Sequence, residues 1–360
     1  MAGRHGLLGV KSYTGSMSSL AKRLAWREVL KLFTSMKEQG IEPDAFCFSV
    51  VSSCCDKVSR WDLALRHFAD MRRHHIKPSV VNFASAVSAC GRGLRWPLAL
   101  QMLEELPRVK LEPDAALLNS VMSACSRAQQ WQRAVSFYEA QKLKDWPNWV
   151  TFGALASALE KGQQWLRAIE MLEQLPVPRP KELTSVVICY NTVLGACEKA
   201  SEWVAALNIL ERMQLKALKA TVITYNTVMM ACERVQRWDS SLHLLSEMQS
   251  HFISPTILSF NTAMNSLQSD RWPLALLLLA EATRLEVEAD KATYTNLIAA
   301  VGATGQWQRC LAYVELLRAV GDGVLGRNAA MAGCNRAHRW REALELFERM
   351  PSEGGESCYY

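Results

Sequence analysis

The chain has 360 residues, of which 49% are hydrophobic and 21% are charged, and its formal net charge is +6. This hydrophobic content is typical of folded proteins and excludes a wholly disordered chain. The longest apolar run, residues 273–280, is shorter than the ~20 residues that span a bilayer, so we expect no membrane-spanning helix. The modest positive charge does not by itself identify an anionic partner.

Ten of the twelve tryptophans recur at intervals of 33 to 38 residues along the chain. They are Trp26, Trp61, Trp96, Trp131, Trp165, Trp203, Trp238, Trp272, Trp307 and Trp340. A period in this range is typical of a repeat array, in which each copy of one supersecondary unit buries its apolar face against its neighbours. Such an array also explains how a chain of this length forms one continuous core, because single globular cores rarely grow so large.

Aligning the sequence on these tryptophans divides the chain into an extension, an array and a tail. Residues 1–9 form an N-terminal extension, and residues 351–360 form a C-terminal tail without helical pattern. Residues 10–350 form an array of about ten units, which start near residues 10, 45, 80, 115, 149, 187, 222, 257, 291 and 324.

Each unit carries the pattern of two helices joined by a turn. In the unit that starts at Val222, the apolar residues Tyr225, Val228 and Cys232 follow helical spacing, and a second amphipathic pattern opens at Trp238. A proline-rich segment, residues 176–186, interrupts the regular spacing after the fifth unit, and we expect a kink or a stiff insert there. The sequence therefore predicts an all-α solenoid of about ten helix–turn–helix repeats.

Six of the eleven cysteines occupy one place in the repeat, close to the end of its first helical pattern. They are Cys55, Cys90, Cys125, Cys197, Cys232 and Cys334. A small thiol at a fixed interior position indicates packing, since free cysteine behaves as a small hydrophobe. The chain has no C-x-x-C pair, so we expect reduced thiols, an intracellular compartment and no metal site. No catalytic constellation is present, and we expect neither enzymatic activity nor a cofactor.

A positive residue stands four places before the tryptophan in eight units. These cations are Lys22, Lys57, Arg92, Arg127, Lys161, Lys199, Arg234 and Arg336. Equivalent positions of a solenoid align on one surface, so they predict a positive stripe suited to a phosphate backbone. The alternative is purely structural, because a cation at a helix C-terminus is favoured by the helix dipole in any protein.

The fifth residue of each unit is polar in most units and is asparagine in five. The fifth residues are Thr14, Ser49, Ala84, Asn119, Gly153, Asn191, Asn226, Asn261, Thr295 and Asn328. An amide offers donors and an acceptor, so these residues can read the edge of a base. The alternative is that they bond to local backbone near a helix start, as asparagine often does.

The stretch "VITYNTVMMACERVQRWDSSLHLLSEMQ", with its "YN" opening, its methionine near the end and the proline-acid loops between units, resembles the pentatricopeptide repeat. The likeness covers about residues 10–350 and is closest to a P-type array without an added C-terminal catalytic domain. It implies a right-handed superhelical solenoid of ~35-residue repeats that binds single-stranded RNA, with about one base read by each repeat.

In this family the fifth and last residues of a repeat select the base, and the second residue clamps it. Carried onto this chain, the base-reading residues are Thr14, Asp44, Ser49, Ser79, Asp114, Asn119, Asn148, Asn191, Thr221, Asn226, Thr256, Asn261, Asp290, Thr295 and Asn328. The base-clamping residues are Phe46, Val81, Val150, Ile188, Ile223 and Leu258. The eight cations of the stripe would bind phosphate.

The resemblance also implies base preferences for three repeats. The pair Thr14/Asp44 looks like a guanine reader, Asn261/Asp290 like a uracil reader, and Asn119/Asn148 should prefer pyrimidines. Gly153 and Val186 offer no hydrogen-bonding side chain in the fifth repeat. We therefore expect the chain to discriminate only weakly between RNA sequences.

The function that this resemblance implies is a monomeric single-stranded RNA-binding adaptor in organellar RNA processing, stabilisation or translation, working with a separate processing factor. We expect a plastid or a mitochondrion, with the chloroplast slightly favoured. Residues 1–27 contain no Asp or Glu and six Lys, Arg or His, as transit sequences do. The alternative is a protein–protein interaction scaffold of the helical-repeat type with no RNA ligand.

Overall fold

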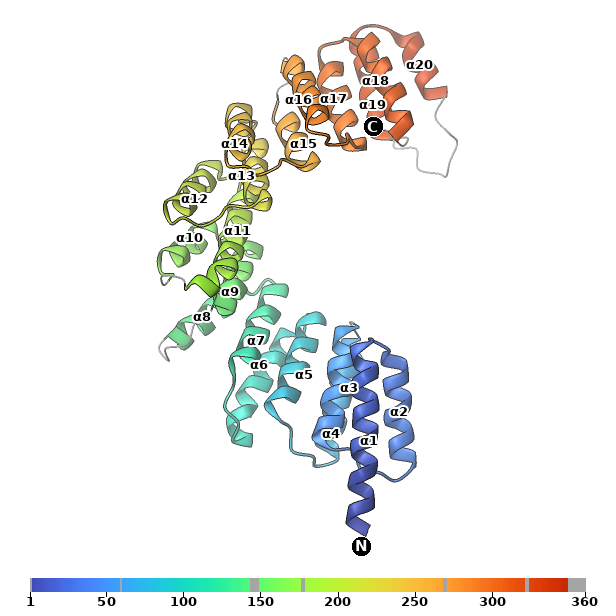
Figure 1. Cartoon of the computed structure of the whole chain (residues 1–360), viewed down its shortest axis with the longest axis vertical. Coiled ribbons are helices and arrows are strands. Elements are labelled where there is room, and N and C mark those ends of the chain that lie inside the picture. The colour runs from blue at the N-terminus through green and yellow to red at the C-terminus, as the bar shows by residue number, and fades with distance from the viewer. Residues whose placement is uncertain are drawn as a thin grey trace. The chain divides into compact units, whose positions relative to one another are not determined.

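The computed structural model describes residues 2–58, 60–142, 149–175, 179–267, 271–320 and 324–348. Every regular element in those ranges is a helix, so the predicted all-α repeat fold is confirmed. The chain divides into two compact units, residues 1–196 and 197–360, which we describe separately (Figure 1).

The first helix of each repeat carries an odd number. These helices are α1 (Ala2–Lys22), α3 (Ala45–Lys57), α5 (Val80–Arg92), α7 (Ala115–Arg127), α9 (Trp149–Lys161), α11 (Leu183–Lys199), α13 (Val222–Arg234), α15 (Ile257–Asn265), α17 (Lys291–Ala303) and α19 (Val324–Arg336).

The second helix of each repeat carries an even number and begins at one of the ten periodic tryptophans. These helices are α2 (Trp26–Glu38), α4 (Trp61–Arg73), α6 (Trp96–Glu105), α8 (Trp131–Lys142), α10 (Trp165–Glu173), α12 (Trp203–Leu215), α14 (Trp238–Ser250), α16 (Trp272–Arg284), α18 (Trp307–Val320) and α20 (Trp340–Glu348). A 3₁₀ turn, η1 (Leu106–Val109), extends α6, and a second one, η2 (Pro180–Glu182), precedes α11.

Two first helices extend further toward the N-terminus than the unit starts near residues 10 and 187. Helix α1 begins at Ala2 and includes most of the residues 1–9 that the sequence assigns to an extension. Helix α11 begins at Leu183 and so takes up the end of the proline-rich segment, where the prolines stop. Residues 176–178 and the tail 351–360 lie outside the described residues.

A short turn joins the two helices of each repeat and reverses the direction of the chain. Where the whole turn lies within the described residues, one of its residues adopts the left-handed conformation, for example Leu94, Gln129 and Gly305 with φ of 55°, 56° and 71°. A left-handed residue just past the last helical turn is a common C-terminal cap, and its amide bonds back to helix carbonyls. This cap places the tryptophan at the start of the second helix.

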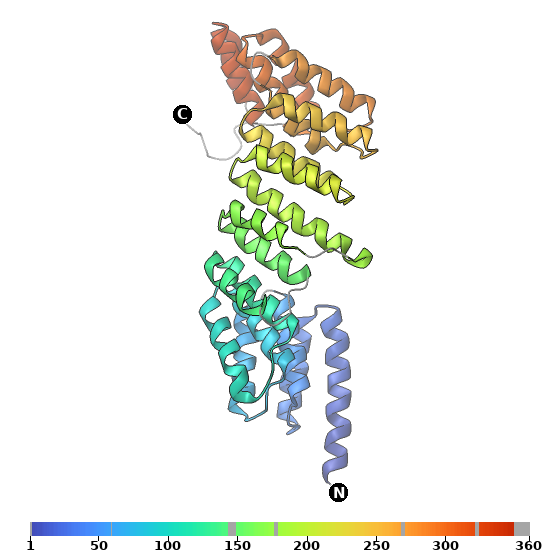
Figure 2. The ribbon, with the colours of Figure 1, turned by 90° about the vertical axis from the view of Figure 1, so that its left-hand side faces the viewer.

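The helices form two layers in each unit (Figures 1 and 2). In residues 1–196, α1, α3, α5, α7 and α9 contact one another in sequence, and in residues 197–360 the same holds for α13, α15, α17 and α19. The even-numbered helices pack against this first-helix layer. Aromatic pairs join successive repeats, as Phe68 does with Phe83 at 5.1 Å between ring centroids. Within the described residues, no helix is both long and apolar enough to cross a membrane.

The cysteines inside the described residues are all buried and free, which confirms that they pack the core. Burial raises the pKa of Cys55, Cys90 and Cys232 to about 11 and that of Cys197 to about 12.

We therefore expect these thiols to react slowly with a thiol reagent such as DTNB. In a Cys358→Ser variant, which removes the cysteine outside the described residues, labelling of the native protein at pH 8 should be at least ~100-fold slower than in denaturant, because few thiolates form. Fast stoichiometric labelling of the folded chain would contradict the packing role.

Candidate nucleic-acid interface

Within each unit, the predicted clamps are exposed apolar side chains at equivalent positions of the first-helix layer, and we call them the row. Their exposed fractions run from 51% to 66%. Side chains this exposed add little to the hydrophobic core of the free protein, so core packing does not account for apolar residues at these positions. The row comprises Phe46, Val81, Val150, Ile188, Ile223 and Leu258. Leu325, the second residue of the tenth repeat, is 75% exposed and extends the row, although the sequence reasoning did not include it.

The fifth residues lie one helical turn after the clamps, on the same face of each first helix. Asn226 and Asn261 are buried, whereas Thr14, Ser49, Asn119, Asn191 and Thr295 are half-buried and Asn328 is exposed. The Thr295 hydroxyl donates to the backbone carbonyl of Lys291 at 2.8 Å, which is a local bond.

Three of the asparagines bond across the repeat boundary rather than to local backbone. The hydroxyl of Thr151 donates to Oδ1 of Asn119 at 2.9 Å, that of Ser259 to Oδ1 of Asn226 at 2.6 Å, and that of Thr293 to Oδ1 of Asn261 at 2.8 Å. Each donor belongs to the following repeat. For Asn119, Asn226 and Asn261, the bonds recorded in the structure therefore join two repeats.

The predicted last residues are the N-caps of the following first helices. The carboxylates of Asp44 and Asp114 each accept a hydrogen bond of 2.8 Å, from the backbone amides of Cys47 and Leu117. Ser79, Thr221, Thr256 and Asp290 hold the same position before their helices. Their side chains thus have a structural task that the sequence reasoning missed, although Ser, Thr and Asp before a helix are its usual signal.

The Asn261/Asp290 pair is joined directly in the structure. Nδ2 of Asn261 donates to Oδ1 of Asp290 at 3.1 Å. Burial would raise the pKa of the Asp290 carboxyl, but hydrogen bonds from Thr293 and Asn261 outweigh burial and lower the pKa. Asp290 is therefore an ionised acceptor at neutral pH. Asn148, the partner predicted for Asn119, lies outside the described residues, and Val186 is buried.

The cations of the stripe lie in the last turn of the first helices, as their spacing before tryptophan predicts. A residue at position 13 of a repeat is eight residues beyond position 5, or about 12 Å along the helix axis. Lys22, Lys57, Arg127, Lys161, Lys199 and Arg336 are exposed.

Arg92 and Arg234 of the stripe also bind carboxylates of the preceding repeat. Nε of Arg92 lies 3.2 Å from Oδ1 of Asp56, and Nε of Arg234 lies 2.5 Å from Oε1 of Glu198. Asp56 and Glu198 are buried. These pairs join neighbouring repeats and reduce the positive charge that Arg92 and Arg234 offer to a ligand.

A second row of cations lies at the same edge of the layers, where the two helices of each repeat meet. In each case an arginine guanidinium lies 3.8 to 6.0 Å from the ring centroid of the tryptophan in the preceding repeat. The pairs are Arg60 on Trp26, Arg95 on Trp61, Arg133 on Trp96, Arg167 on Trp131, Arg237 on Trp203, Arg271 on Trp238, Arg309 on Trp272 and Arg339 on Trp307. Cation–π contacts of this kind stabilise repeat stacking by about 0.5–1 kcal/mol each at exposed sites.

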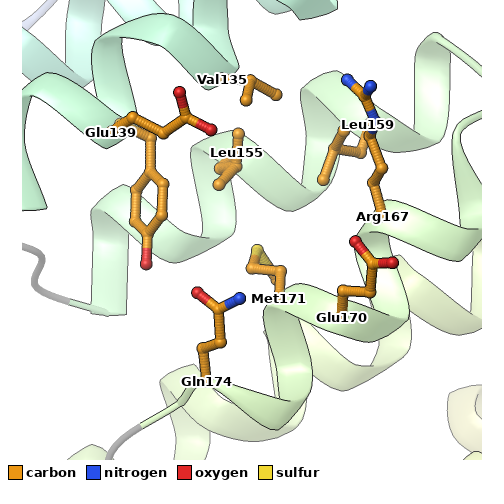
Figure 3. Close-up of a pocket in the computed structure, with 9 residues that line it drawn as sticks. Val135, Glu139, Leu155, Leu159, Arg167, Glu170, Met171 and Gln174 are labelled. Carbon is orange, nitrogen blue, oxygen red and sulfur yellow. The ribbon is translucent and has the colours of Figure 1, made fainter.

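A cavity of about 430 Å³ lies between the first helix α9 and the second helices α8 and α10 (Figure 3). Leu155, Leu159 and Met171 provide its apolar part, while Glu139 lies on one side and Glu170 on the other. None of its lining residues belongs to the reading, clamping or stripe sets. Among the described residues no group of three or more His, Cys, Asp or Glu could hold a metal ion.

Family models of the pentatricopeptide repeat match three parts of the sequence. A pentatricopeptide repeat domain model matches residues 181–235 and 208–268, and a model of a pentatricopeptide repeat-containing protein matches residues 27–141. A model of the single repeat matches residues 12–41 and 328–355. No curated protein sequence matches the chain significantly.

Among solved structures, the chain is similar to the pentatricopeptide repeat protein PPR10 from maize, with a TM-score of 0.64 and 22% identity. The match covers 96% of this chain and 59% of the maize chain, so this chain spans less than two thirds of the length of that protein. A structure of PPR10 in complex with an 18-nt psaJ RNA element aligns with a TM-score of 0.48 and 22% identity, over 97% of this chain and 55% of that chain.

The family models together match residues 12–141, 181–268 and 328–355, which is more than half of the chain, and the fold is that of a pentatricopeptide repeat protein along nearly the whole chain. The chain therefore belongs to the pentatricopeptide repeat family.

Proposed function

We propose that the chain binds single-stranded RNA with about one base to each repeat, as a non-enzymatic adaptor. The observation that carries the proposal is the order of three side-chain types along the first helices, which is complete in α3, α11, α13 and α19. An exposed apolar residue at position 2 and an amide or hydroxyl at position 5 lie at one end, and a cation at position 13 lies at the other.

This order matches the two chemistries of a nucleotide. A base offers a flat apolar face and a polar edge, which suit the clamp and the reading residue respectively. A phosphate is a charged group at the other end of the nucleotide, and it suits the cation about 12 Å away along the helix. Recurrence of these side-chain types at equivalent positions along the array supports a linear polymer as the ligand.

The electrostatics of the layer edge also favour an anionic polymer. The stripe cations and the tryptophan-stacked arginines lie at the same edge, so positive charge gathers there although the net charge of the chain is only +6. Family membership further supports RNA as the polymer. We further propose that the protein acts in a plastid or a mitochondrion, as a monomer that delivers its RNA to a separate processing factor.

The proposal is tested by comparing single-stranded and duplex RNA as ligands. The purified chain is titrated with labelled single-stranded RNA of random sequence and with a duplex of the same length. Bases of a duplex are paired and stacked, so clamps and amides cannot reach their faces and edges. We expect the duplex to bind at least ~10-fold more weakly. Equal binding, or none to either RNA, would contradict the proposal and favour a protein partner.

An Asn261→Ala variant should lose discrimination at a single base. Asn261 and Asp290 form a joined polar pair, and removing an amide that bonds to a base edge costs about 1 kcal/mol, or roughly a five- to tenfold preference. Sequencing of RNA selected from a random pool should show that the base preference is lost at one position and is the same as for the wild type at the others. Uniform weakening at all positions would instead indicate that Asn261 only packs the repeats.

A further inference from the structure

The third residue of several repeats carries a hydroxyl that the reading scheme does not use. Thr151, Ser259 and Thr293 are buried, and each donates its hydroxyl hydrogen to the fifth-residue asparagine of the preceding repeat. These three contacts occur in both units of the chain, so they do not reflect one local irregularity.

The sequence shows that the hydroxyl accompanies the asparagine. Each of the four repeats with asparagine at position 5, up to Asn261, is followed by a repeat with Thr or Ser at position 3. The pairs are Asn119 with Thr151, Asn191 with Thr224, Asn226 with Ser259, and Asn261 with Thr293. Where position 5 is Thr14, Ser49, Ala84, Gly153 or Thr295, the following third residues are Cys47, Asn82, Leu117, Cys189 and Gly326, none with a hydroxyl. A general need for a hydroxyl at the helix start would not produce this association.

The direction of the hydrogen bond at Asn261 is fixed by its neighbours. The carboxylate of Asp290 can only accept, and it accepts from Nδ2 of Asn261 at 3.1 Å. Turning the amide over would place its oxygen against this carboxylate. Oδ1 of Asn261 therefore faces Thr293, whose oxygen accepts from the backbone amide of Asp290 at 3.2 Å. The hydroxyl hydrogen of Thr293 lies within reach of two acceptors, Oδ1 of Asn261 at 2.8 Å and Oδ1 of Asp290 at 2.9 Å.

The same pair of hydrogen bonds, from a backbone amide to a hydroxyl and from that hydroxyl to an asparagine, recurs one repeat earlier. The backbone amide of Thr256 donates to Oγ of Ser259 at 3.1 Å, and the hydroxyl of Ser259 donates to Oδ1 of Asn226 at 2.6 Å. Both the last residue and the fifth residue of one repeat are thus held by one hydroxyl of the next. With its oxygen turned inward toward this hydroxyl, the amide presents its NH₂ group outward, which favours bases that offer an acceptor at that edge.

We propose that Thr151, Ser259 and Thr293 are positioning residues that orient the reading asparagine of the preceding repeat and thereby set its base preference. This inference rests on the proposed RNA-binding function. It implies that one base is read by side chains from two successive repeats, so a repeat transplanted without its successor would read its base poorly.

The test uses position-matched substitutions in the full chain and a random pool of single-stranded RNA. Asn261→Ala marks the RNA position read by repeat eight, and Thr295→Ala marks that of repeat nine. Thr293→Val removes the hydroxyl but keeps the size and branching of the side chain. We expect Thr293→Val to reduce the preference at the repeat-eight position by about five- to tenfold, as for one lost hydrogen bond. Thr293→Ser, which keeps the hydroxyl, should restore it.

The inference is overturned if Thr293→Val leaves the repeat-eight preference intact, or if it alters the repeat-nine position to which Thr293 belongs in the sequence. Ser259→Ala and Ser259→Thr provide the same comparison for Asn226. A purely structural role would lower the thermal midpoint and weaken all RNAs alike without changing any single position.

A measurement without RNA separates this inference from the proposed function. In the free protein, the side-chain amide protons of Asn261, assigned by their loss in Asn261→Ala, should exchange with solvent about five- to tenfold faster in Thr293→Val than in the wild type. Unchanged exchange would overturn the positioning role even if RNA binds. Failure of the wild type to bind any single-stranded RNA would overturn the proposed function, while the exchange rates would still decide whether Thr293 holds Asn261.

Discussion

The triple variant Lys57→Gln, Arg127→Gln and Lys161→Gln will bind single-stranded RNA about 100-fold more weakly than the wild type at ~0.1 M salt. Each cation that neutralises a phosphate of a single strand contributes about 0.7 to the slope of log affinity against log salt, which is a factor of ~5 at 0.1 M relative to 1 M. Three such contacts together give the expected loss, and the slope should become shallower by about two.

These three cations are chosen because they are exposed and have no carboxylate partner in the described part of the chain, unlike Arg92 and Arg234. Removing Arg234 would leave the buried Glu198 uncompensated, and so would mix a folding effect with a binding effect. The matched control is Lys31→Gln, Arg66→Gln and Arg108→Gln, which makes the same change in net charge at exposed cations of α2, α4 and η1. If the control variant loses as much affinity as the stripe variant, net charge and not the stripe attracts the RNA.

The triple variant Ile223→Ser, Leu258→Ser and Leu325→Ser will lose affinity by a similar factor but keep the salt slope of the wild type. Covering a base with an apolar side chain stabilises the complex by about 1 kcal/mol each, so three lost clamps weaken binding by roughly 100-fold. The side chains are 66%, 51% and 75% exposed, so the free energy of unfolding should change little.

Isothermal titration at two salt concentrations measures affinity and slope together. The control variant is Leu215→Ser, Leu277→Ser and Leu316→Ser, which removes three exposed leucines from the second helices α12, α16 and α18 of the same unit. It should bind as the wild type does. A loss confined to the clamp variant, with an unchanged slope, separates base contacts from phosphate contacts. Equal loss in both variants would show that exposed apolar side chains act through solubility or folding.

The repeat architecture could be predicted because its signals are local and periodic. Each periodic tryptophan starts a second helix, and a cation four residues earlier lies in the last turn of a first helix. Both depend on spacing within one repeat, which the sequence displays directly. The helix starts at Ala2 and Leu183 could not be placed in the same way, because the periodic pattern marks repeats and not the helical residues that precede them.

The contacts between repeats were not predictable, because they depend on how successive first helices stack. Arg92 reaches Asp56 across 36 residues, and Thr293 reaches Asn261 across 32. The arginines that stack on tryptophan come from two different places, directly before the next tryptophan as in Arg95 or two residues after it as in Arg133. Because arginines from two different repeat positions reach equivalent tryptophan rings, an alignment of the repeats does not show these arginines in one column. The repeated "RW" dipeptide was the one visible signal.

The N-caps could have been found, because their signal is local. Asp44, Asp114 and Asp290 each precede a helical pattern and accept from the amide three residues later. Assigning these residues to base reading alone overlooked that Asp, Ser and Thr are the usual residues at this position. In Asp290 the two roles coincide, since one carboxylate caps α17 and receives Nδ2 of Asn261.

The salt dependence of affinity for single-stranded RNA tests the central claim most directly. The full chain is titrated with labelled single-stranded RNA over a range of salt concentrations, and log affinity is plotted against log salt. An ordered row of phosphate contacts predicts a straight line with a slope of about −3 or steeper, since at least five exposed stripe cations each contribute about −0.7. A slope near zero, or no binding at low salt, would contradict the account and identify the first-helix layer as a surface for another protein.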